Sequence, residues 1–158
     1  MEKSKLLPLS IFIFRKGLGS IFVGLSLLAL SAPIIQSIFD FPSGEGIYGL
    51  LSPICHQFPT RSFWVTNRPM ALCSRCFGGY LGLGIGLLLI NTQIRYLKSL
   101  ALGILLIIPG IVDGSVQLLT QYESKNAIRF ILGSIGGLGL FFMFFPFGSN
   151  STNKKGTK

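Results

Sequence analysis

The sequence predicts an all-α, polytopic membrane protein: a bundle of four transmembrane helices with a short interfacial helix in its outer loop. Hydrophobic residues make up 49% of the 158 residues and charged residues only 12%, about half the charged share of soluble domains. The apolar residues form four long blocks, each able to cross a hydrocarbon core about 30 Å thick. Inside lipid a backbone must satisfy its own hydrogen bonds, so we expect each block to be a helix.

The four blocks differ in the charges that they contain. The first has none, whereas the second, third and fourth contain Arg75, Asp113 and Arg129, respectively. Together they form one transmembrane domain over residues 1–147, and the polar, basic segment 148–158 is expected to be a disordered cytoplasmic tail. The blocks cover approximately residues 17–39, 72–90, 97–119 and 127–147.

Lysine and arginine residues lie at the ends of the apolar blocks, which predicts the orientation of the protein in the cell membrane. The net charge of +9 could suggest nucleic acid, but no basic stripe carries interleaved aromatics, so we expect lipid contact and no nucleic-acid partner. Three basic groups fall on one side of a four-span chain, and the positive-inside rule makes that side cytoplasmic. Both termini are then cytoplasmic, and residues 40–71 and 120–126 lie outside. The groups are Lys3, Lys5, Arg15 and Lys16, then Arg95 and Lys98, and finally Lys154, Lys155 and Lys158.

The N-terminal segment allows a second interpretation, as a cleaved signal peptide. Basic residues, an apolar stretch and the small residues Ala29, Ser31 and Ala32 are typical of such a leader. The apolar stretch is longer than the usual signal core of about 7–15 residues, so an uncleaved helix is favoured.

The outer loop contains an apolar stripe that predicts a short helix at the membrane interface, ending near Cys55. The stripe lies between Gly46 and Pro59, and Phe63 and Trp64 follow it, as expected for aromatic side chains at headgroup depth. Its apolar residues are Ile47, Tyr48, Leu50, Leu51 and Ile54.

Glycines recur every four residues in two blocks, at Gly78, Gly82 and Gly86 and at Gly133 and Gly137. Such spacing lets helix backbones approach closely in lipid. A phosphate-binding glycine loop would need a preceding strand, which does not fit a membrane span. We expect these faces to pack helices within the bundle, and an oligomer could form through the same faces.

All three cysteines and the only histidine fall in one short stretch, at Cys55, His56, Cys73 and Cys76. Thiolates and imidazole are zinc ligands, and three cysteines with one histidine make a closed structural site. The Cys73–Cys76 spacing suits chelation, but Cys55 and His56 are adjacent, and adjacent helical side chains diverge by about 100°. A site with water or Asp113 in place of one of them would be open, as catalytic zinc sites are. The sequence therefore predicts a zinc-like metal site, structural or hydrolytic.

The same cysteines allow two interpretations without a metal. A Cys-x-x-Cys pair at a helix N-terminus, beside Arg75, has a lowered thiol pKa, and the outer face of the membrane is oxidising. Cys73 and Cys76, with Cys55 as partner, could therefore form a thiol–disulfide oxidoreductase. A structural disulfide between two of the three is the simpler alternative, and His56 could act as a general base.

Asp113 lies within an apolar block, where a carboxylate costs roughly 2.5–3.5 kcal/mol at mid-bilayer and less near the edge. It must therefore face other helices and find a partner, and Arg75 and Arg129 are expected at that depth. Gln117 is one turn further on the face of Asp113, and Asn126 precedes Arg129 by three residues. We expect these five residues to lock the helices together or to act in catalysis. A third possible function is a binding or transport module, in which these side chains bind a small charged ligand.

Several motifs, in order, resemble one known family. They are Cys55-His56-Gln57, Arg61-Ser62-Phe63, Leu72-Cys73-Ser74-Arg75-Cys76 followed by Gly78-Gly79-Tyr80-Leu81-Gly82, and then Pro109, Asp113-Gly114, Gln117, Asn126 and Arg129. Over roughly residues 48–137 the chain resembles the prokaryotic membrane-protein family catalogued as domain of unknown function 2085. The resemblance implies a small multi-span membrane protein without an assigned activity. Phe77 departs from the small polar residue expected at its position.

Overall fold

The computed structural model describes residues 3–39, 43–90 and 96–145, and most of these residues are helical. The elements are α1 (Lys3–Phe39), α2 (Ser43–Leu51), η1 (Pro59–Arg61), β1 (Trp64–Val65), β2 (Arg68–Pro69), α3 (Ser74–Leu89), α4 (Tyr96–Leu119) and α5 (Asn126–Phe144). The predicted helical character is confirmed. The expected tail over residues 148–158 lies outside the described residues.

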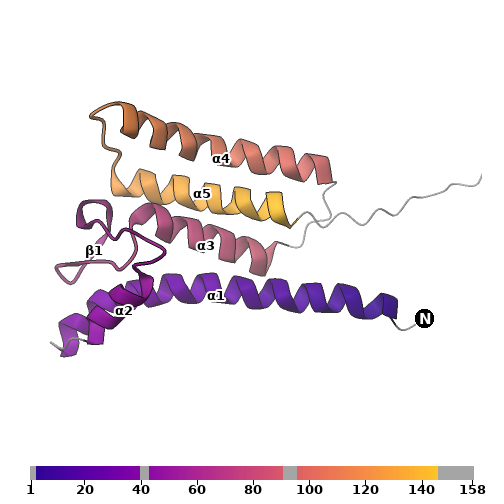
Figure 1. Cartoon of the computed structure of the whole chain (residues 1–158), viewed down its shortest axis with the longest axis horizontal. Coiled ribbons are helices and arrows are strands. Elements are labelled where there is room, and N and C mark those ends of the chain that lie inside the picture. Colours follow the sequence, from indigo (N-terminus) through magenta and orange to yellow (C-terminus); the bar gives the residue numbers. More distant parts are fainter. Residues whose placement is uncertain (1–2, 40–42, 91–95, 146–158) are drawn as a thin grey trace, which may run out of the picture.

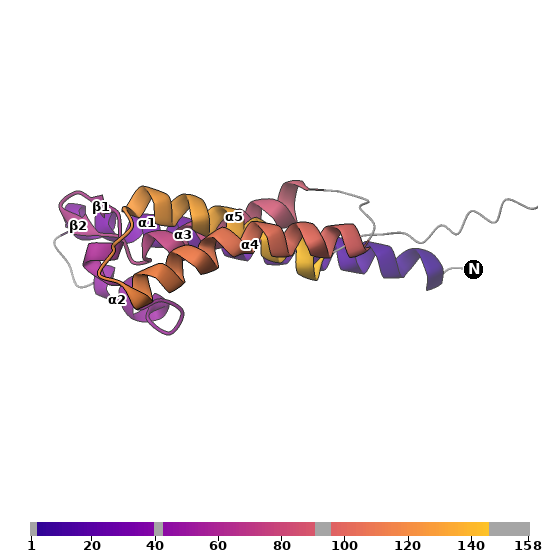
Figure 2. The same ribbon diagram turned by 90° about the horizontal axis from the view of Figure 1, so that it is seen from above.

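The four long helices lie side by side in one row, in the order α1, α3, α5, α4 (Figure 1). α3 contacts both α1 and α5, and α4 packs on α5. The row is thin when seen from above (Figure 2), so the expected bundle takes the form of a layer. α3 and α5 begin at the end of the molecule where α1 and α4 finish, and we call this the cap end.

Small residues explain why α3 and α5 approach so closely. A Cβ at Gly82 would overlap the backbone of Ser134, and a Cβ at Gly137 would overlap the carbonyl oxygen of Gly79. The glycine spacing in the sequence therefore packs α3 on α5 within one chain, as predicted. Since Gly82 and Gly137 are buried in this contact, they present no surface to a second copy.

Three helices are long and apolar enough to cross a membrane: α1 over Phe12–Ile38, α4 over Ser99–Leu119, and all of α5. The second expected span, residues 72–90, is a 16-residue helix, about 24 Å long at 1.5 Å per residue. This is shorter than a hydrocarbon core of about 30 Å, so length alone supports three of the four expected spans in the described part of the chain. Cys73 and Ile90, which flank α3, adopt extended backbone conformations, so the helix ends at both.

Basic side chains of α1 bind the backbone carbonyls at the C-terminus of α3. Arg15 donates from Nη1 to the Ile90 carbonyl at 2.8 Å, and Lys16 donates to the Leu88 carbonyl. The last carbonyls of a helix lack intrahelical partners, and positive charge there is favourable. The basic residues that serve as a topology signal in the sequence thus also satisfy the C-terminus of α3.

Residues 43–73, with α2, η1 and the β1–β2 hairpin, form a cap over the cap end (Figure 1). A short helix, α2, covers the first part of the apolar stripe but ends at Leu51, before the expected end near Cys55, because the chain turns over residues 52–54. No sequence pattern indicates the hairpin. Val65 lies opposite Arg68, and Thr66 and Asn67 turn the chain with φ of 51° and 60°. Two-residue hairpin turns of type I′ need this left-handed conformation at both positions, which an Asn-Gly or Asp-Gly pair usually signals.

A buried hydrophobic core joins the cap to α1 and α3. The Ala71 N–H donates to the Ala29 carbonyl at 3.4 Å, which ties the end of the cap to the C-terminal third of α1. Cys55 belongs to this core, so one candidate ligand is buried in it. The buried members are Ala29, Ala32, Leu51, Cys55, Ala71 and Leu72.

Candidate metal centre

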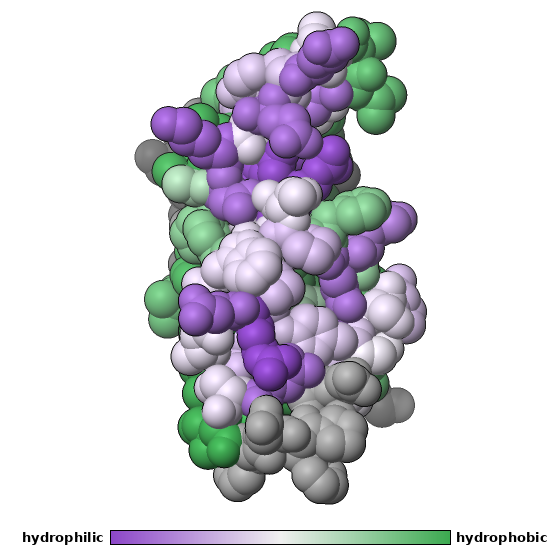
Figure 3. Space-filling model, turned by 90° about the vertical axis from the view of Figure 1, so that its left-hand side faces the viewer, coloured by the Kyte–Doolittle hydropathy of each residue, from purple (hydrophilic) through white to green (hydrophobic). Residues whose placement is uncertain are grey.

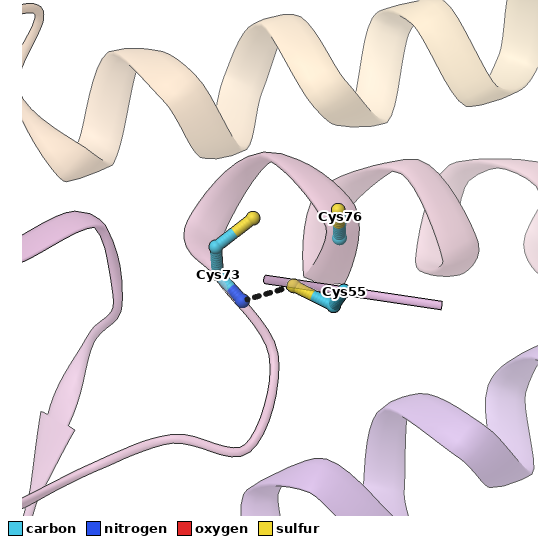
Figure 4. A group of neighbouring side chains, drawn as sticks. All are labelled: Cys55, Cys73 and Cys76. Atoms are coloured by element: carbon cyan, nitrogen blue, oxygen red, sulfur yellow. Dashed lines mark hydrogen bonds between the residues drawn. The ribbon is translucent and has the colours of Figure 1, made fainter. Parts of the chain in front are cut away.

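The three cysteines meet where the cap joins the first turn of α3. Cys55 follows α2, and its N–H donates to the Leu51 carbonyl at 3.1 Å. Cys73 is the N-cap of α3, and Cys76 lies in its first turn. Their sulfur atoms all lie within 4.8 Å of one another, with Cys55 approaching from the cap and the other two from α3 (Figure 4).

Among the three sulfur atoms, that of Cys55 accepts the hydrogen bonds that its neighbours donate. It accepts the Cys73 N–H at 3.2 Å and the Gln57 N–H at 3.5 Å. Donation from the Cys73 thiol, and then from the Cys76 thiol, lowers the pKa of Cys55. The same hydrogen bond to Cys55 raises the pKa of Cys73. The group therefore favours a thiolate at Cys55, and metal binding requires deprotonated sulfur.

His56, the fourth candidate ligand, lies outside the three-sulfur group. Its side chain is exposed, and its ring stacks on Phe58 with 5.9 Å between centroids. It nevertheless lines the same cavity of about 290 Å³ as the three cysteines, together with Ile54, Phe58 and Arg61. The adjacency of Cys55 and His56 thus has the expected consequence that one side chain faces the core and the other faces solvent.

The polar residues predicted behind the cysteines form one hydrogen-bonded network between α3, α4 and α5. Arg75 of α3 forms an ion pair with Asp113 of α4, whose side chain is only 10% exposed. Gln117, one turn further along α4, donates to the same carboxylate at 2.6 Å. Arg129 of α5 donates to the Gln117 Oε1 at 3.2 Å. Asp113, the alternative metal ligand, is thereby engaged away from the three-sulfur group.

Ser124 and Asn126 connect this network to α5 and to the cap. The buried Ser124 hydroxyl accepts hydrogen bonds from Gln117 at 2.8 Å and from Arg129 at 3.2 Å. Asn126 accepts from Arg129 at 3.3 Å and donates to the Ser62 carbonyl at 2.9 Å. Sequence reasoning missed Ser124, because a serine in a short polar loop carries no signal until the fold brings its partners to it.

A second, smaller cavity of about 110 Å³ lies between the network and the cysteines. Its lining residues are Arg61, Cys73, Arg75, Cys76, Gln117 and Arg129. Arg61, which belongs to η1, lines both cavities and was absent from the predicted site. The Arg61-Ser62-Phe63 motif was the signal that could have found it.

The match to a known protein family covers the whole candidate site. The profile of the family described as "Predicted membrane protein (DUF2085)" matches residues 55–143, which include every candidate site residue. An uncharacterised protein of Methanocaldococcus jannaschii is 40% identical over 105 residues, covering 63% of this chain and 67% of that protein. Another, from Methanothermobacter thermautotrophicus, is 38% identical over 89 residues, covering 55% of this chain and 80% of that protein.

No solved structure matches the chain. The match to the family profile extends over more than half of the chain and confirms the resemblance seen in the motifs. The chain belongs to the DUF2085 family of predicted membrane proteins.

Proposed function

We propose that this membrane protein holds a zinc-type ion through Cys55, Cys73 and Cys76 at the outer face of the cell membrane. The observation that carries the proposal is the convergence of the three sulfur atoms within 4.8 Å of one another. Zinc binds thiolate sulfur at about 2.3 Å, which corresponds to sulfur–sulfur separations of roughly 3.8 Å in a tetrahedral site. Small side-chain rotations would bring the three sulfurs to that spacing.

The fourth ligand position is open to water in this proposal. Catalytic zinc sites have three protein ligands and one exchangeable position, whereas structural sites have four protein ligands. The cavity of about 290 Å³ beside the sulfurs supports the open arrangement. Zinc lowers the pKa of a bound water to about 7, and His56 lines the cavity where a proton acceptor would be needed. We therefore infer hydrolysis at the membrane surface, with a purely structural ion as the alternative.

The polar network supports the sulfur group in this proposal. Arg75 lies between Cys73 and Cys76 in the sequence, so its ion pair with Asp113 steadies the turn that carries two ligands. On the other side, the hydrogen bond from Asn126 to the Ser62 carbonyl links α5 to the cap. Gln117 and Arg129 complete the network and, with Arg75, face the small cavity from which a substrate could approach the ion.

We further propose that α3 crosses the membrane as the fourth span despite its 16 residues. Arg15 and Lys16 satisfy its C-terminal carbonyls, and basic residues mark the cytoplasmic boundary. The cap lies beside the rest of α1, where Thr66 donates to the Pro33 carbonyl at 3.1 Å. The cap end has a polar face with apolar surface at its edges (Figure 3), as expected for an outer surface at headgroup depth.

Metal analysis of the purified protein tests the proposal. We expect elemental mass spectrometry to find about one zinc ion per chain, because the three sulfurs would supply three of the four ligands of one tetrahedral ion. Cys73→Ser and Cys76→Ser are each expected to abolish binding. His56→Ala is the matched control: retained metal supports the open fourth position, and lost metal supports a closed, four-ligand site. An intact protein purified without chelator that carries no metal would rule out the centre.

A second function is favoured by the backbone N–H groups of Cys73 and Gln57 that donate to the Cys55 sulfur, because these hydrogen bonds and those from the neighbouring thiols lower the pKa of Cys55. A thiolate within 4.8 Å of two thiols is suited to thiol–disulfide exchange with a disulfide-bonded partner protein. The thiolate attacks one sulfur of the partner's disulfide, the S–S bond breaks, and the partner's other sulfur leaves as a thiolate, which gives a mixed disulfide that a second cysteine thiolate can resolve. Thiol trapping in cells separates the two functions. Cysteines that alternate between free and disulfide-bonded forms would support exchange, whereas cysteines that stay reduced and metal-bound would support the zinc centre.

A further inference from the structure

The smaller cavity points to a ligand other than the metal. It measures about 110 Å³, and three of its lining side chains are the arginines Arg61, Arg75 and Arg129, contributed by η1, α3 and α5. The cavity exceeds the volume of one water molecule, which occupies about 30 Å³ in the liquid. Guanidinium groups that converge on one cavity match the geometry of phosphate and carboxylate oxygens.

Arg129 is the strongest indication that an anion belongs in this cavity. Its side chain is only 4% exposed, and it donates hydrogen bonds to the neutral oxygens of Ser124, Asn126 and Gln117. A buried cation is unfavourable unless negative charge compensates it. In the part of the chain that the structure describes, Arg129 forms no ion pair with a carboxylate.

The other two arginines also have capacity for a ligand. Asp113 pairs with Nη2 of Arg75, but Nε of Arg75 is buried and has no hydrogen-bond partner among the described residues. Arg61 meets Glu123 at 3.8 Å, and both side chains are largely exposed, so solvent screens that pair. A zinc ion with three thiolates would carry a net charge of about −1. The positive charge of the three arginines therefore exceeds the combined negative charge of Asp113 and such a metal centre.

Two helix N-termini add to the positive potential at this end of the molecule. α3 begins after Cys73 and α5 after Lys125, and neither N-cap side chain binds the first-turn N–H groups. The N-terminus of a helix favours negative charge. Cys76 and Arg129, which lie in the first turns of these helices, both line the cavity.

We propose that this arginine cavity binds a tetrahedral oxyanion of the phosphate class, either free phosphate or the phosphate of an anionic lipid headgroup. The cavity shares Arg61, Cys73 and Cys76 with the larger cavity, whose wall includes the exposed apolar side chains of Ile54 and Phe58. The larger cavity could therefore accept the rest of an amphipathic molecule. The oxyanion site goes beyond the metal centre, because it depends on the arginines and persists in metal-free protein.

Binding of two probes to the intact, EDTA-treated protein tests this site. We expect saturable binding of inorganic phosphate by calorimetry in detergent, or retention of phosphatidic acid by native mass spectrometry from nanodiscs, with phosphatidylcholine as the comparison lipid. Phosphate binding identifies a free oxyanion as the ligand. Selective retention of phosphatidic acid without phosphate binding identifies a lipid headgroup. Binding of neither probe, or equal retention of both lipids without phosphate binding, overturns the proposal.

Substitutions then assign the binding to the cavity. Arg61→Gln, at an exposed position that should tolerate the change, is expected to weaken binding about tenfold through loss of one charge-assisted contact. Arg129→Lys keeps the charge but loses the planar fork, so it should also weaken binding. Arg68→Gln is the matched control, because Arg68 belongs to the cap but lines a different pocket, with Gln36 and Tyr48. Equal effects of Arg61→Gln and Arg68→Gln would refute the site. Since the protein is metal-free throughout, failure here leaves the zinc proposal standing, and the converse also holds.

Discussion

Cys55 serves both the core and the candidate site. It is 5% exposed and packs with Ala29 and Leu51, yet its sulfur accepts the backbone N–H groups of Cys73 and Gln57. Burial alone disfavours a thiolate. The hydrogen bonds to its sulfur lower its pKa and so favour a thiolate on a side chain that solvent barely reaches, which would suit the proposed metal centre.

A pH titration of the metal-free protein tests this charge. Hydrogen bonds lower the pKa of Cys55 from its ordinary value of 9.0, so below about pH 9 the unfolded chain binds a proton that the folded chain does not. The stability that Cys55 contributes is complete above that pH and is lost as the pH falls through the lowered, folded-state pKa. We expect ultraviolet thiolate absorbance at neutral pH in the native protein and its loss in Cys55→Ala. A native thiolate signal that appears only near pH 9 would contradict this assignment.

Asp113→Asn is expected to destabilise the protein by about 1–3 kcal/mol, because it leaves the Arg75 cation without its carboxylate in a partly buried place. Thermal unfolding in detergent measures the loss. Glu123→Gln is the matched control: it removes the exposed partner of Arg61 at 3.8 Å and should cost less than about 1 kcal/mol. Equal losses would mean that the Arg75–Asp113 pair stabilises the helices no more than a surface pair does.

At the scale of elements, α3 is the helix on which the site depends, although it is the shortest of the four helices in the row. Its first turn carries Arg75 and Cys76, and its last carbonyls are bound by Arg15 and Lys16. Its glycine face lies against α5. Lipid provides no hydrophobic driving force between helices, so this close backbone contact must supply much of the packing energy.

A pair of neighbouring glycines in α5 tests that contact. A Cβ at Gly137 would overlap the Gly79 carbonyl oxygen, whereas a Cβ at Gly136 would meet nothing within 4 Å. We expect Gly137→Ala to lower stability by about 1–3 kcal/mol through overpacking. Gly136→Ala should be neutral or stabilise by up to about 1 kcal/mol, as alanine does in a helix. Thermal unfolding of both variants measures the two changes in stability. An unchanged stability of Gly137→Ala would exclude close backbone packing as the basis of the α3–α5 contact.

On the scale of the whole molecule, one row of helices carries its core and its polar network at the same end. Apolar side chains on α4, such as Leu105, Ile111 and Leu118, are exposed in the single chain, which suits contact with lipid. At the cap end, Ala29 and Ala32 of α1 are buried in the core with the cap.

The number of spans determines where the two ends of the chain lie. With α3 as a fourth span, both ends are on the same side, and the positive-inside rule makes that side cytoplasmic. With three spans, the ends lie on opposite sides. We expect fluorescent-protein fusions at either end to fluoresce in the cytoplasm and a phosphatase fusion after Tyr122 to be active outside. Opposite locations of the two ends would exclude the four-span arrangement and make α3 a helix that does not cross.

The sequence by itself determined the helical membrane class and the family, and it predicted candidate site residues, of which the three cysteines meet in the structure. Long apolar blocks and the cost of placing charge in lipid act along the chain, so Asp113 and the cysteines could be recognised without a fold. The glycine spacing likewise predicted a packing face, because helical periodicity alone brings such residues to one side.

Only the tertiary structure decided which groups meet. It brought Cys55 from the cap to Cys73 and Cys76, left His56 facing solvent, and added Ser124 and Arg61 to the site. These outcomes depend on how the cap folds over α1 and α3, with a hairpin turn and extended residues at the ends of α3 that no periodic pattern signals. Contacts between segments distant in the sequence arise from packing, and packing is a property of the folded molecule as a whole.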